Sequence, residues 1–438
     1  MRSLLSCSLS IGAVAIMAAL APVNADLVGH GGMVRAVDFS RDGQRVVTAG
    51  FDYSAIIWNF EDQRKITVLD GHEGPVTNAR FLPDGRVFTT GNDMVGIVWR
   101  MTGDEARIDY RLHGHTHNIM AAGIFDNGQQ LVTGSWDKTV RIWNSHTGRQ
   151  TRIIKVQTPV NAVAIIDDEK SIAVGGHDSV IRIFDLRTGR ARGKLEGHKM
   201  GITELRANPG GGQLLSSSID KTLRLWDVRA LRLLRIFERH DSQVFSVRFT
   251  PDGKYAVSGG RDGYVIIWDL NTGKPSKSIK AHEQIVWSVA VSPDGRFAVS
   301  GSSDETARIW HLVTRDRIGE NVAVSSEAKP WLVSQHPGAS MFRKCARCHG
   351  LDPDGVRRSG PHFKGLFGRR VGTVDGYRYS ESLKERDFIW DKETLFRLFD
   401  EGPDKFLPGT KMPVQRVTDR EKLTQLVDYL EQLTGATQ

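Results

Sequence analysis

Cysteine is scarce in this chain of 438 residues, which contains only three. So few cysteines exclude a disulfide-stabilised scaffold. Long apolar runs are also missing, apart from one at the extreme N-terminus, and this excludes a polytopic membrane protein. The net charge of +8 forms no basic run of the kind that grips nucleic acid. We therefore expect neither stable membrane insertion nor a nucleic-acid partner.

Residues 1–25 have the pattern of an export signal. Arg2 supplies a positive start, the apolar run from Ile11 to Ala21 follows, and small residues lead to a cleavage site after Ala25. The pattern predicts a signal peptide and a bacterial periplasmic location. The alternative is an uncleaved anchor, although the run is short for a span of about 20 residues.

The middle of the chain repeats one pattern seven times, and each unit has an Asp followed six residues later by an aromatic residue. The pairs are Asp52/Trp58, Asp93/Trp99, Asp137/Trp143, Asp178/Phe184, Asp220/Trp226, Asp262/Trp268 and Asp304/Trp310. Six units also have a His that lies 21 or 22 residues before the Asp and a Ser or Thr that lies four before it. Alternating strands and Asp-Gly or Asn-Gly turns separate these positions, which predicts four short strands in each unit.

These residues resemble the WD40 family of β-propellers, with Trp226-Asp227 and Trp268-Asp269 near the ends of their repeats. The resemblance implies an all-β, seven-bladed propeller over residues 26–325. It also implies that each His, Ser or Thr, Asp and Trp form a buried hydrogen-bonded tetrad. Because buried polar groups must be paired, we interpret these residues as structural and not catalytic.

The fourth repeat departs from this pattern. Its tetrad positions hold Val156, Val174 and Phe184, and only Asp178 is kept. We expect an apolar core there, because a half-satisfied polar network is less stable than an apolar one.

Closure of the ring requires an outer strand for the last blade. The segment from Asp26 to Val28 is short for this purpose, so we expect residues 315–324 to supply the strand.

One rim of the propeller channel is predicted to be a binding surface. In WD40 propellers, the start of the innermost strand and the residue before each Asp lie on the same rim. Six of these positions carry large apolar side chains: Phe51, Met120, Trp136, Ile219, Phe245 and Trp287. Such a patch indicates an interface for another protein or for the chain's own C-terminal domain. The alternative is that neighbouring side chains cover them.

The chemistry of the chain is concentrated in the string Cys345-Ala346-Arg347-Cys348-His349. Two thiols three residues apart, followed by His, form the attachment signature of a c-type haem. Cleavage after Ala25 would leave these as the only cysteines. We therefore expect one covalently attached haem c per chain. Structural zinc and a redox dithiol are the alternatives, but two thiolates are too few for a closed zinc site and no βαβ pattern surrounds them.

The C-terminal part resembles a class I cytochrome c of the mitochondrial and bacterial c2 type, on Gly360-Pro361, residues 365–369, Tyr379, Trp390 and the loop at 408–413. The resemblance implies an all-α monohaem domain over residues 337–438, after a linker at 326–336. It also implies roles for six residues. His349 and Met412 would be the axial ligands, the Pro361 carbonyl would accept the other imidazole proton, and Arg369, Tyr379 and Trp390 would pair with a haem propionate.

Basic residues are expected around the exposed haem edge: Lys344, Lys364, Arg370, Lys405 and Lys411. Such a ring would steer redox proteins that have acidic docking surfaces. The alternative is an ordinary solvated surface of mixed charge.

We interpret the chain as a periplasmic electron carrier, because an iron with both axial positions filled favours electron transfer. The propeller would then be a protein-docking platform. Two alternatives stay open. One is an oxidoreductase whose propeller holds a second cofactor or substrate, and the other is a haem-bearing scaffold or redox sensor.

Overall fold

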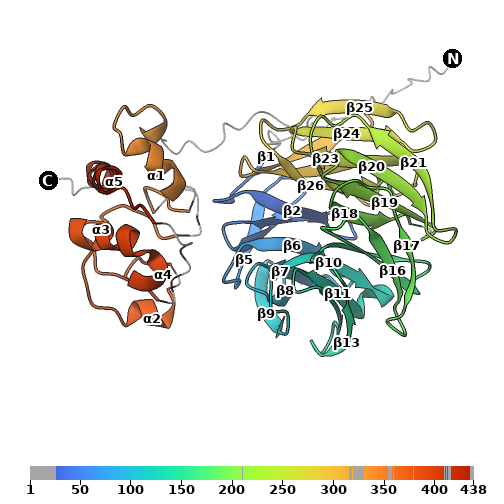
Figure 1. Cartoon of the computed structure of the whole chain (residues 1–438), viewed down its shortest axis with the longest axis horizontal. Helices are drawn as coiled ribbons and strands as arrows, with labels where there is room; N and C mark the ends of the chain where they lie inside the picture. Colours follow the sequence, from blue (N-terminus) through green and yellow to red (C-terminus); the bar gives the residue numbers. More distant parts are fainter. Residues whose placement is uncertain are drawn as a thin grey trace, which may run out of the picture.

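The computed structural model describes residues 26–209, 211–314, 318, 330–346, 348–353, 358, 360–377, 379–408, 410, 412 and 416–434. Seven four-stranded antiparallel sheets occupy residues 26–311, and short helices occupy residues 330–434. Figure 1 shows the sheets as the blades of a ring, with the helices grouped beside it. The predicted combination of an all-β propeller and a helical domain is confirmed.

Each blade runs from an innermost to an outermost strand. The innermost strands are β2 (Val34–Phe39), β6 (Val76–Phe81), β10 (Ile119–Phe125), β14 (Val160–Ile166), β18 (Ile202–Ala207), β22 (Val244–Phe249) and β26 (Val286–Val291). The second strands are β3 (Arg45–Gly50), β7 (Val87–Gly91), β11 (Gln130–Ser135), β15 (Ser171–Gly176), β19 (Gln213–Ser218), β23 (Tyr255–Gly260) and β27 (Phe297–Ser302). The third strands are β4 (Ser54–Asn59), β8 (Gly96–Thr102), β12 (Thr139–Asn144), β16 (Ile181–Asp185), β20 (Thr222–Asp227), β24 (Tyr264–Asp269) and β28 (Thr306–His311). The outermost strands are β5 (Lys65–Asp70), β9 (Glu105–Leu112), β13 (Gln150–Lys155), β17 (Ala191–Leu195), β21 (Arg232–Glu238), β25 (Pro275–Lys280) and β1 (Asp26–Val28).

The apolar core lies between neighbouring blades. Ile57 and Leu69 of blade one, for example, share a buried cluster with Val76 and Ile97 of blade two. Both faces of an inner strand are therefore covered, one by each neighbour. This packing explains why the second and third strands are buried along most of their length, whereas the outer strands are largely exposed.

Six blades contain the predicted tetrad. In blade three, Thr133 Oγ1 lies 2.7 Å from His115 Nε2 and accepts a hydrogen bond from Trp143 Nε1 at 2.9 Å. His115 Nδ1 lies 2.7 Å from a carboxylate oxygen of Asp137. The equivalent hydroxyl groups in the other five blades are those of Thr48, Thr89, Ser216, Ser258 and Ser300.

The charge states of the His and the Asp determine which atom donates in each hydrogen bond of a tetrad. Burial lowers the pKa of His115, so its ring is neutral at pH 7. A carboxylate can only accept, so Nδ1 donates to Asp137 and Nε2 accepts from the Thr133 hydroxyl. In blade seven, burial opposes ionisation of Asp304, yet hydrogen bonds from His282 and Thr306 lower its pKa to about 2. These pairings support the interpretation of the tetrads as structural.

Blade four has the predicted apolar replacement. Val156, Val174 and Phe184 are buried in one cluster, with Val174 only 1% exposed. Asp178 pairs instead with Arg182 at 2.7 Å.

The strand that closes the ring is not the one that the sequence predicted. The outer strand of blade seven is β1, which pairs antiparallel with β28 from Asp26↔Arg308 to Val28↔Thr306. The expectation that residues 315–324 supply this strand is therefore wrong for the part of the edge that β1 covers. Three residues are enough because Leu27 is buried between β28 and blade one. Of the segment 315–324 only Ile318 is described, and its N–H donates to the Ile309 carbonyl at 3.1 Å.

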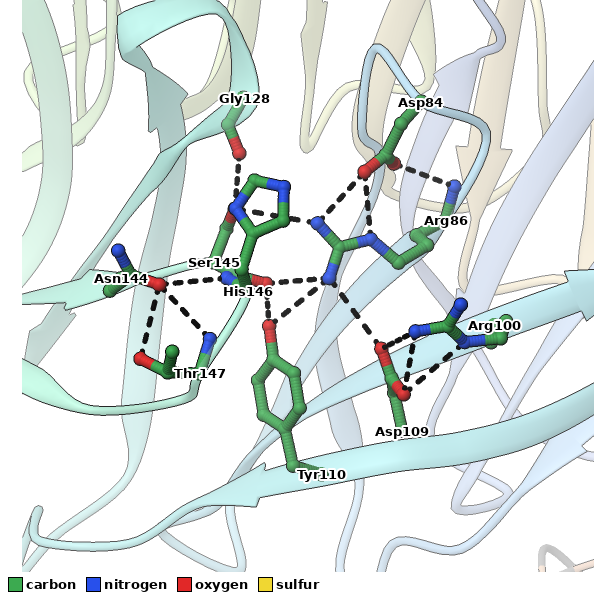
Figure 2. Close-up of polar contacts among 10 residues, drawn as sticks. All are labelled: Asp84, Arg86, Arg100, Asp109, Tyr110, Gly128, Asn144, Ser145, His146 and Thr147. Carbon is green, nitrogen blue, oxygen red and sulfur yellow. Dashed lines mark hydrogen bonds and ion pairs between the residues drawn. The ribbon is translucent and has the colours of Figure 1, made fainter.

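A buried arginine connects blades two and three. Figure 2 shows the Arg86 guanidinium between Asp84 and the Ser145 carbonyl, which accepts from Nη1 at 2.6 Å. Tyr110 donates to the same carbonyl, and Asp109 lies 3.6 Å from Nη1. Because Arg86 is only 7% exposed, these partners are what make its burial tolerable.

The C-terminal helices are α1 (Ala339–Cys345), α2 (Glu381–Lys384), α3 (Lys392–Glu401), α4 (Pro403–Phe406) and α5 (Arg420–Thr434). The first, third and fifth helices pack around a common core that contains Phe342, Leu398 and Leu423. Trp331, in the expected linker, belongs to this core and lies 5.3 Å from the Phe342 ring. None of the helices in the described part of the chain has the length and apolar character needed to span a bilayer.

The tetrad can be tested by exchanging hydroxyl and methyl groups between adjacent blades. Thr133→Val should lower the free energy of unfolding by about 2 kcal/mol or more, because it leaves the buried Trp143 N–H and His115 Nε2 unpaired. Val174→Thr should cost about 1–3 kcal/mol, because its hydroxyl would be buried beside apolar neighbours. Urea unfolding followed by far-ultraviolet circular dichroism measures both changes. The two substitutions are nearly isosteric, so unchanged stability in Thr133→Val would contradict the role of the hydroxyl.

Candidate functional site

The helical domain contains a large, mostly apolar cavity. Its apolar walls include Phe363, Leu366, Leu383, Leu398 and Phe399. All eight residues that the sequence assigned to cofactor binding line it: Cys345, Cys348, His349, Pro361, Arg369, Tyr379, Trp390 and Met412.

Both cysteines are placed by the end of α1. The helix ends at Cys345, and the chain then turns so that the N–H groups of Cys348 and His349 each donate to the Cys345 carbonyl at 3.0 Å. This turn brings the two sulfurs and the imidazole to the same wall of the cavity. Neither cysteine is in a disulfide, and burial raises the pKa of Cys345 to about 12, so it is a thiol at pH 7.

His349 is held in one tautomer. Its Nδ1 lies 2.7 Å from the Pro361 carbonyl oxygen, which can only accept, so Nδ1 carries the proton. Burial lowers the pKa of His349 to about 4, and the ring is therefore neutral with a free lone pair on Nε2. Phe363 stacks on the ring at 4.6 Å. Gly360 is required beside it, because a Cβ there would lie 2.4 Å from His349 Cε1.

Met412 enters the cavity from the loop between α4 and α5. Its side chain is half-buried and packs against the helical core. Its backbone N–H donates to the Thr410 hydroxyl at 3.2 Å, which orients this part of the loop. The thioether is a soft, neutral donor, and together with the His349 imidazole it forms a pair suited to iron.

Arg369, Tyr379 and Trp390 form a more polar part of the lining. The Arg369 guanidinium donates to the carbonyls of Lys364 and His362, both at 2.9 Å. Burial lowers the pKa of Arg369 and raises the pKa of Tyr379. Backbone hydrogen bonds from Trp390 N–H to the Arg369 carbonyl, and from Gly368 N–H to the Trp390 carbonyl, hold the two segments together.

Sequence reasoning missed the contribution of the propeller. Tyr53 lines the same cavity, together with Tyr377 of the helical domain. Arg358 is 6% exposed, and its Nη1 lies 3.3 Å from both the Gly31 carbonyl and a Glu305 carboxylate oxygen. The helices accordingly lie beside blades one and seven.

The position of Tyr53 and Glu305 in their repeats is a feature of the sequence that could have identified them. Tyr53 and Glu305 both follow a tetrad Asp, at the tip of the turn between the second and third strands. Their φ angles of 70° and 72° show that this position is a repeated left-handed turn. The sequence shows that such tips exist, but not which of them a second domain contacts.

The six rim residues are all half-buried. Met120, Phe245 and Trp287 meet at the mouth of a central cavity, where the rings of Phe245 and Trp287 lie 4.3 Å apart. Trp136 lies farther around the ring, 5.5 Å from His177, and donates to Asn161 Oδ1 at 2.9 Å. Phe51 and Ile219 do not line this cavity. The patch is therefore discontinuous.

The predicted basic ring is only partly described. Lys344 lines the large cavity and is exposed, and Lys405 is exposed as well. Lys364 and Arg370 pair with acidic neighbours, Asp352 at 3.4 Å and Asp387 at 3.2 Å. Lys411 lies outside the described residues, as do residues 1–25.

Comparisons with known proteins agree with this division. Seven segments match the family described as WD domain, G-beta repeat: residues 22–59, 63–100, 107–144, 148–185, 189–227, 231–269 and 273–311. Residues 336–434 match the family described as Cytochrome c.

Cytochromes c from several organisms match about 98 residues of the chain. A cytochrome c from Gibberella zeae is 38% identical over 98 residues, which are 22% of this chain and 92% of that protein. A cytochrome c2 from Blastochloris viridis is 37% identical over 98 residues, 22% of this chain and 76% of the relative. A cytochrome c from Arabidopsis thaliana is 38% identical over 98 residues, 22% of this chain and 87% of the relative.

Proposed function

The chain belongs to the WD40-repeat family through seven repeats and to the cytochrome c family through residues 336–434, and we propose that it is an exported, one-electron carrier of the bacterial periplasm. A cytochrome c domain implies covalently bound haem c, which supplies an iron that gains or loses a single electron. The residues present fit this group: two free thiols, a neutral imidazole and a thioether line one large apolar cavity.

The observation that carries the proposal is the state of His349. Its Nδ1–H is committed to the Pro361 carbonyl, so only Nε2 is free to bind a metal. Met412 supplies a neutral thioether to the same lining. We assign these two side chains as the axial ligands and Cys345 and Cys348 as the covalent attachment points. With both axial positions filled, small substrates would find no open site on the iron, which favours electron transfer over catalysis.

Export is supported by the sequence pattern of residues 1–25 and by the chemistry of attachment. Signal cleavage after Ala25 would remove Cys7 and leave only the two attachment thiols. With no third thiol in the cleaved chain, neither attachment cysteine can be mispaired with another cysteine of the chain in an oxidising compartment.

Two surfaces are proposed to receive redox partners. The first is the edge of the large cavity, where Lys344 and Lys405 are exposed and would attract an acidic docking surface. The second is the propeller rim, where Met120, Phe245 and Trp287 surround the mouth of the channel. Large apolar groups that are only half-buried are typical of protein interfaces.

The axial ligation can be tested with two matched methionine variants. We expect the exported protein to contain one covalently bound haem, by pyridine haemochrome and iron counting, with a low-spin spectrum and a sulfur-to-iron charge-transfer band. Met412→Leu should abolish that band and allow carbon monoxide to bind. Met341→Leu, which changes a methionine packed against the same core, should leave both properties unchanged. A charge-transfer band that survives in Met412→Leu would contradict the assignment.

The basic edge can be tested with small redox reagents of opposite charge. Lys344→Glu combined with Lys405→Glu should slow electron exchange with anionic hexacyanoferrate about tenfold or more at low salt, because a local attraction becomes a repulsion. Exchange with a cationic cobalt complex should become faster, and both effects should fade as salt screens the charges. Lys138→Glu combined with Lys254→Glu, which are exposed lysines of the propeller, is the control for net charge. Equal rates in the two double variants would count against the basic edge.

The rim can be tested by truncating two of its tryptophans. Trp136→Ala combined with Trp287→Ala should abolish cross-links between the propeller and periplasmic proteins of the source bacterium, or change the small-angle scattering profile of the chain. Ile153→Ala combined with Leu234→Ala, on exposed outer strands, should change neither. Identical cross-links and scattering in the Trp136/Trp287 variant would refute a docking role for the rim.

A further inference from the structure

The channel through the propeller carries more basic than acidic groups, and nothing in the electron-transfer role accounts for them. Six charged side chains from the innermost strands converge there: Arg35, Asp38, Arg80, Glu204, Arg206 and Arg248. Four guanidinium groups against two carboxylates leave an excess of two positive charges. Five of these six residues line the cavity at the rim end of the channel.

Each carboxylate oxygen of Glu204 accepts two hydrogen bonds. Its Oε1 accepts from Arg206 at 2.5 Å and from Arg248 at 2.6 Å. Its Oε2 accepts from the Ser246 hydroxyl at 2.6 Å and from the Val247 N–H at 2.9 Å. The hydrogen bonds of this carboxylate are therefore made with Arg206, Arg248 and blade six, and it acts on Arg35 and Arg80 only through space.

Arg80 has a much weaker partner. Its Nη1 lies 3.9 Å from Asp38 Oδ1, which is beyond hydrogen-bonding distance. Asp38 accepts instead from the Phe81 N–H at 3.3 Å. Burial lowers the pKa of Arg80, and the charges of Asp38 and Glu204 oppose this shift. The Arg80 guanidinium makes no hydrogen bond with a described residue, so its donors can bind a ligand in the channel.

Arg35 makes no hydrogen bond or ion pair with a described acidic residue, and the Glu204 carboxylate favours its charge only through space. Its guanidinium lies over the Trp287 ring, 5.2 Å from the centroid, at the mouth of the channel. Burial lowers the pKa of Arg35, and the charge of Glu204 opposes this shift. The polar side chains of the neighbouring inner strands make no hydrogen bond with Arg35 and are paired elsewhere. Thr203 donates to the Val244 carbonyl at 2.6 Å, and Asn78 to the Met120 carbonyl at 3.0 Å.

We propose that the channel is a binding site for a small dianionic oxyanion of the phosphate or sulfate type, held by Arg35 and Arg80. Both arginines line the rim-end cavity, and a planar guanidinium matches the paired oxygens of such an anion. Two negative charges would balance the excess in the channel, whose concave walls concentrate its positive potential. This proposal concerns the propeller alone and does not depend on haem ligation.

The site can be tested on the full, haem-loaded chain by isothermal titration calorimetry with inorganic phosphate and with sulfate, with sodium chloride at equal ionic strength as the reference. We expect one anion per chain. Arg35→Gln and Arg80→Gln should each weaken binding at least about tenfold, because each removes a charge-assisted donor. Arg261→Gln removes the same charge from an exposed position on the propeller and should bind like the unaltered chain.

Three outcomes would overturn the proposal: no saturable heat with either oxyanion, equal binding in Arg35→Gln, or equal weakening in Arg261→Gln. If Arg80→Gln fails to fold, Arg35→Gln still decides, because the Arg35 side chain makes no hydrogen bond with any described residue that folding could require. An unchanged haem spectrum in every variant keeps this result separate from any failure of the electron-transfer proposal.

Discussion

The propeller depends on a buried hydroxyl group in each of six blades, which must form hydrogen bonds with both a Trp and a His. In six blades a buried Ser or Thr oxygen accepts from the tryptophan N–H of the third strand and contacts the His that precedes the first strand. The same His is held by an Asp from the following turn. These bonds connect the second and third strands of a blade, and the turn between them, with the loop that enters the blade. Since an unpaired buried donor is costly, the His, the hydroxyl residue and the Trp are kept together or lost together. Blade four shows the second case, with Val156, Val174 and Phe184 in their places.

The haem site follows from an equally local constraint. The Cys345 carbonyl accepts two backbone hydrogen bonds, and this turn places both thiols and the imidazole on one wall. The Pro361 carbonyl then selects the tautomer of His349, and Gly360 leaves room for the ring. Ligand orientation is thus set by backbone groups, which a substitution of surface side chains would not disturb.

The two modules are not independent. Tyr53 closes part of the haem cavity, and Arg358 is buried against Glu305 and the Gly31 carbonyl. All three propeller residues lie in loops next to the tetrads, so the hydrogen bonds that organise blades one and seven also fix the surface that meets the cytochrome domain. The channel differs from the tetrads, because its polar groups are not mutually satisfied. Arg35 and Arg80 retain free donors where a purely structural channel would be neutral.

Much of this protein is determined by the sequence alone. The repeat spacing predicts seven blades and names the residues of each tetrad, because a buried polar network needs particular groups at particular separations. The Cys-x-x-Cys-His string predicts the attachment residues for the same reason, since two thiols and an imidazole must reach one cofactor. The lining of the large cavity by Pro361, Arg369, Tyr379, Trp390 and Met412 also agrees with the sequence prediction.

Only the tertiary structure decided which strand closes the ring, which turn meets the second domain and which charges remain unpaired. The short strand at Asp26–Val28 suffices because Leu27 is buried by two blades that are far apart in sequence. Arg358 meets the Gly31 carbonyl across 327 residues of chain, and Tyr53 lines a cavity of the distant helical domain, and no local sequence pattern predicts either contact. The arginines of the channel come from separate blades, so their excess charge becomes apparent only when the ring brings them together.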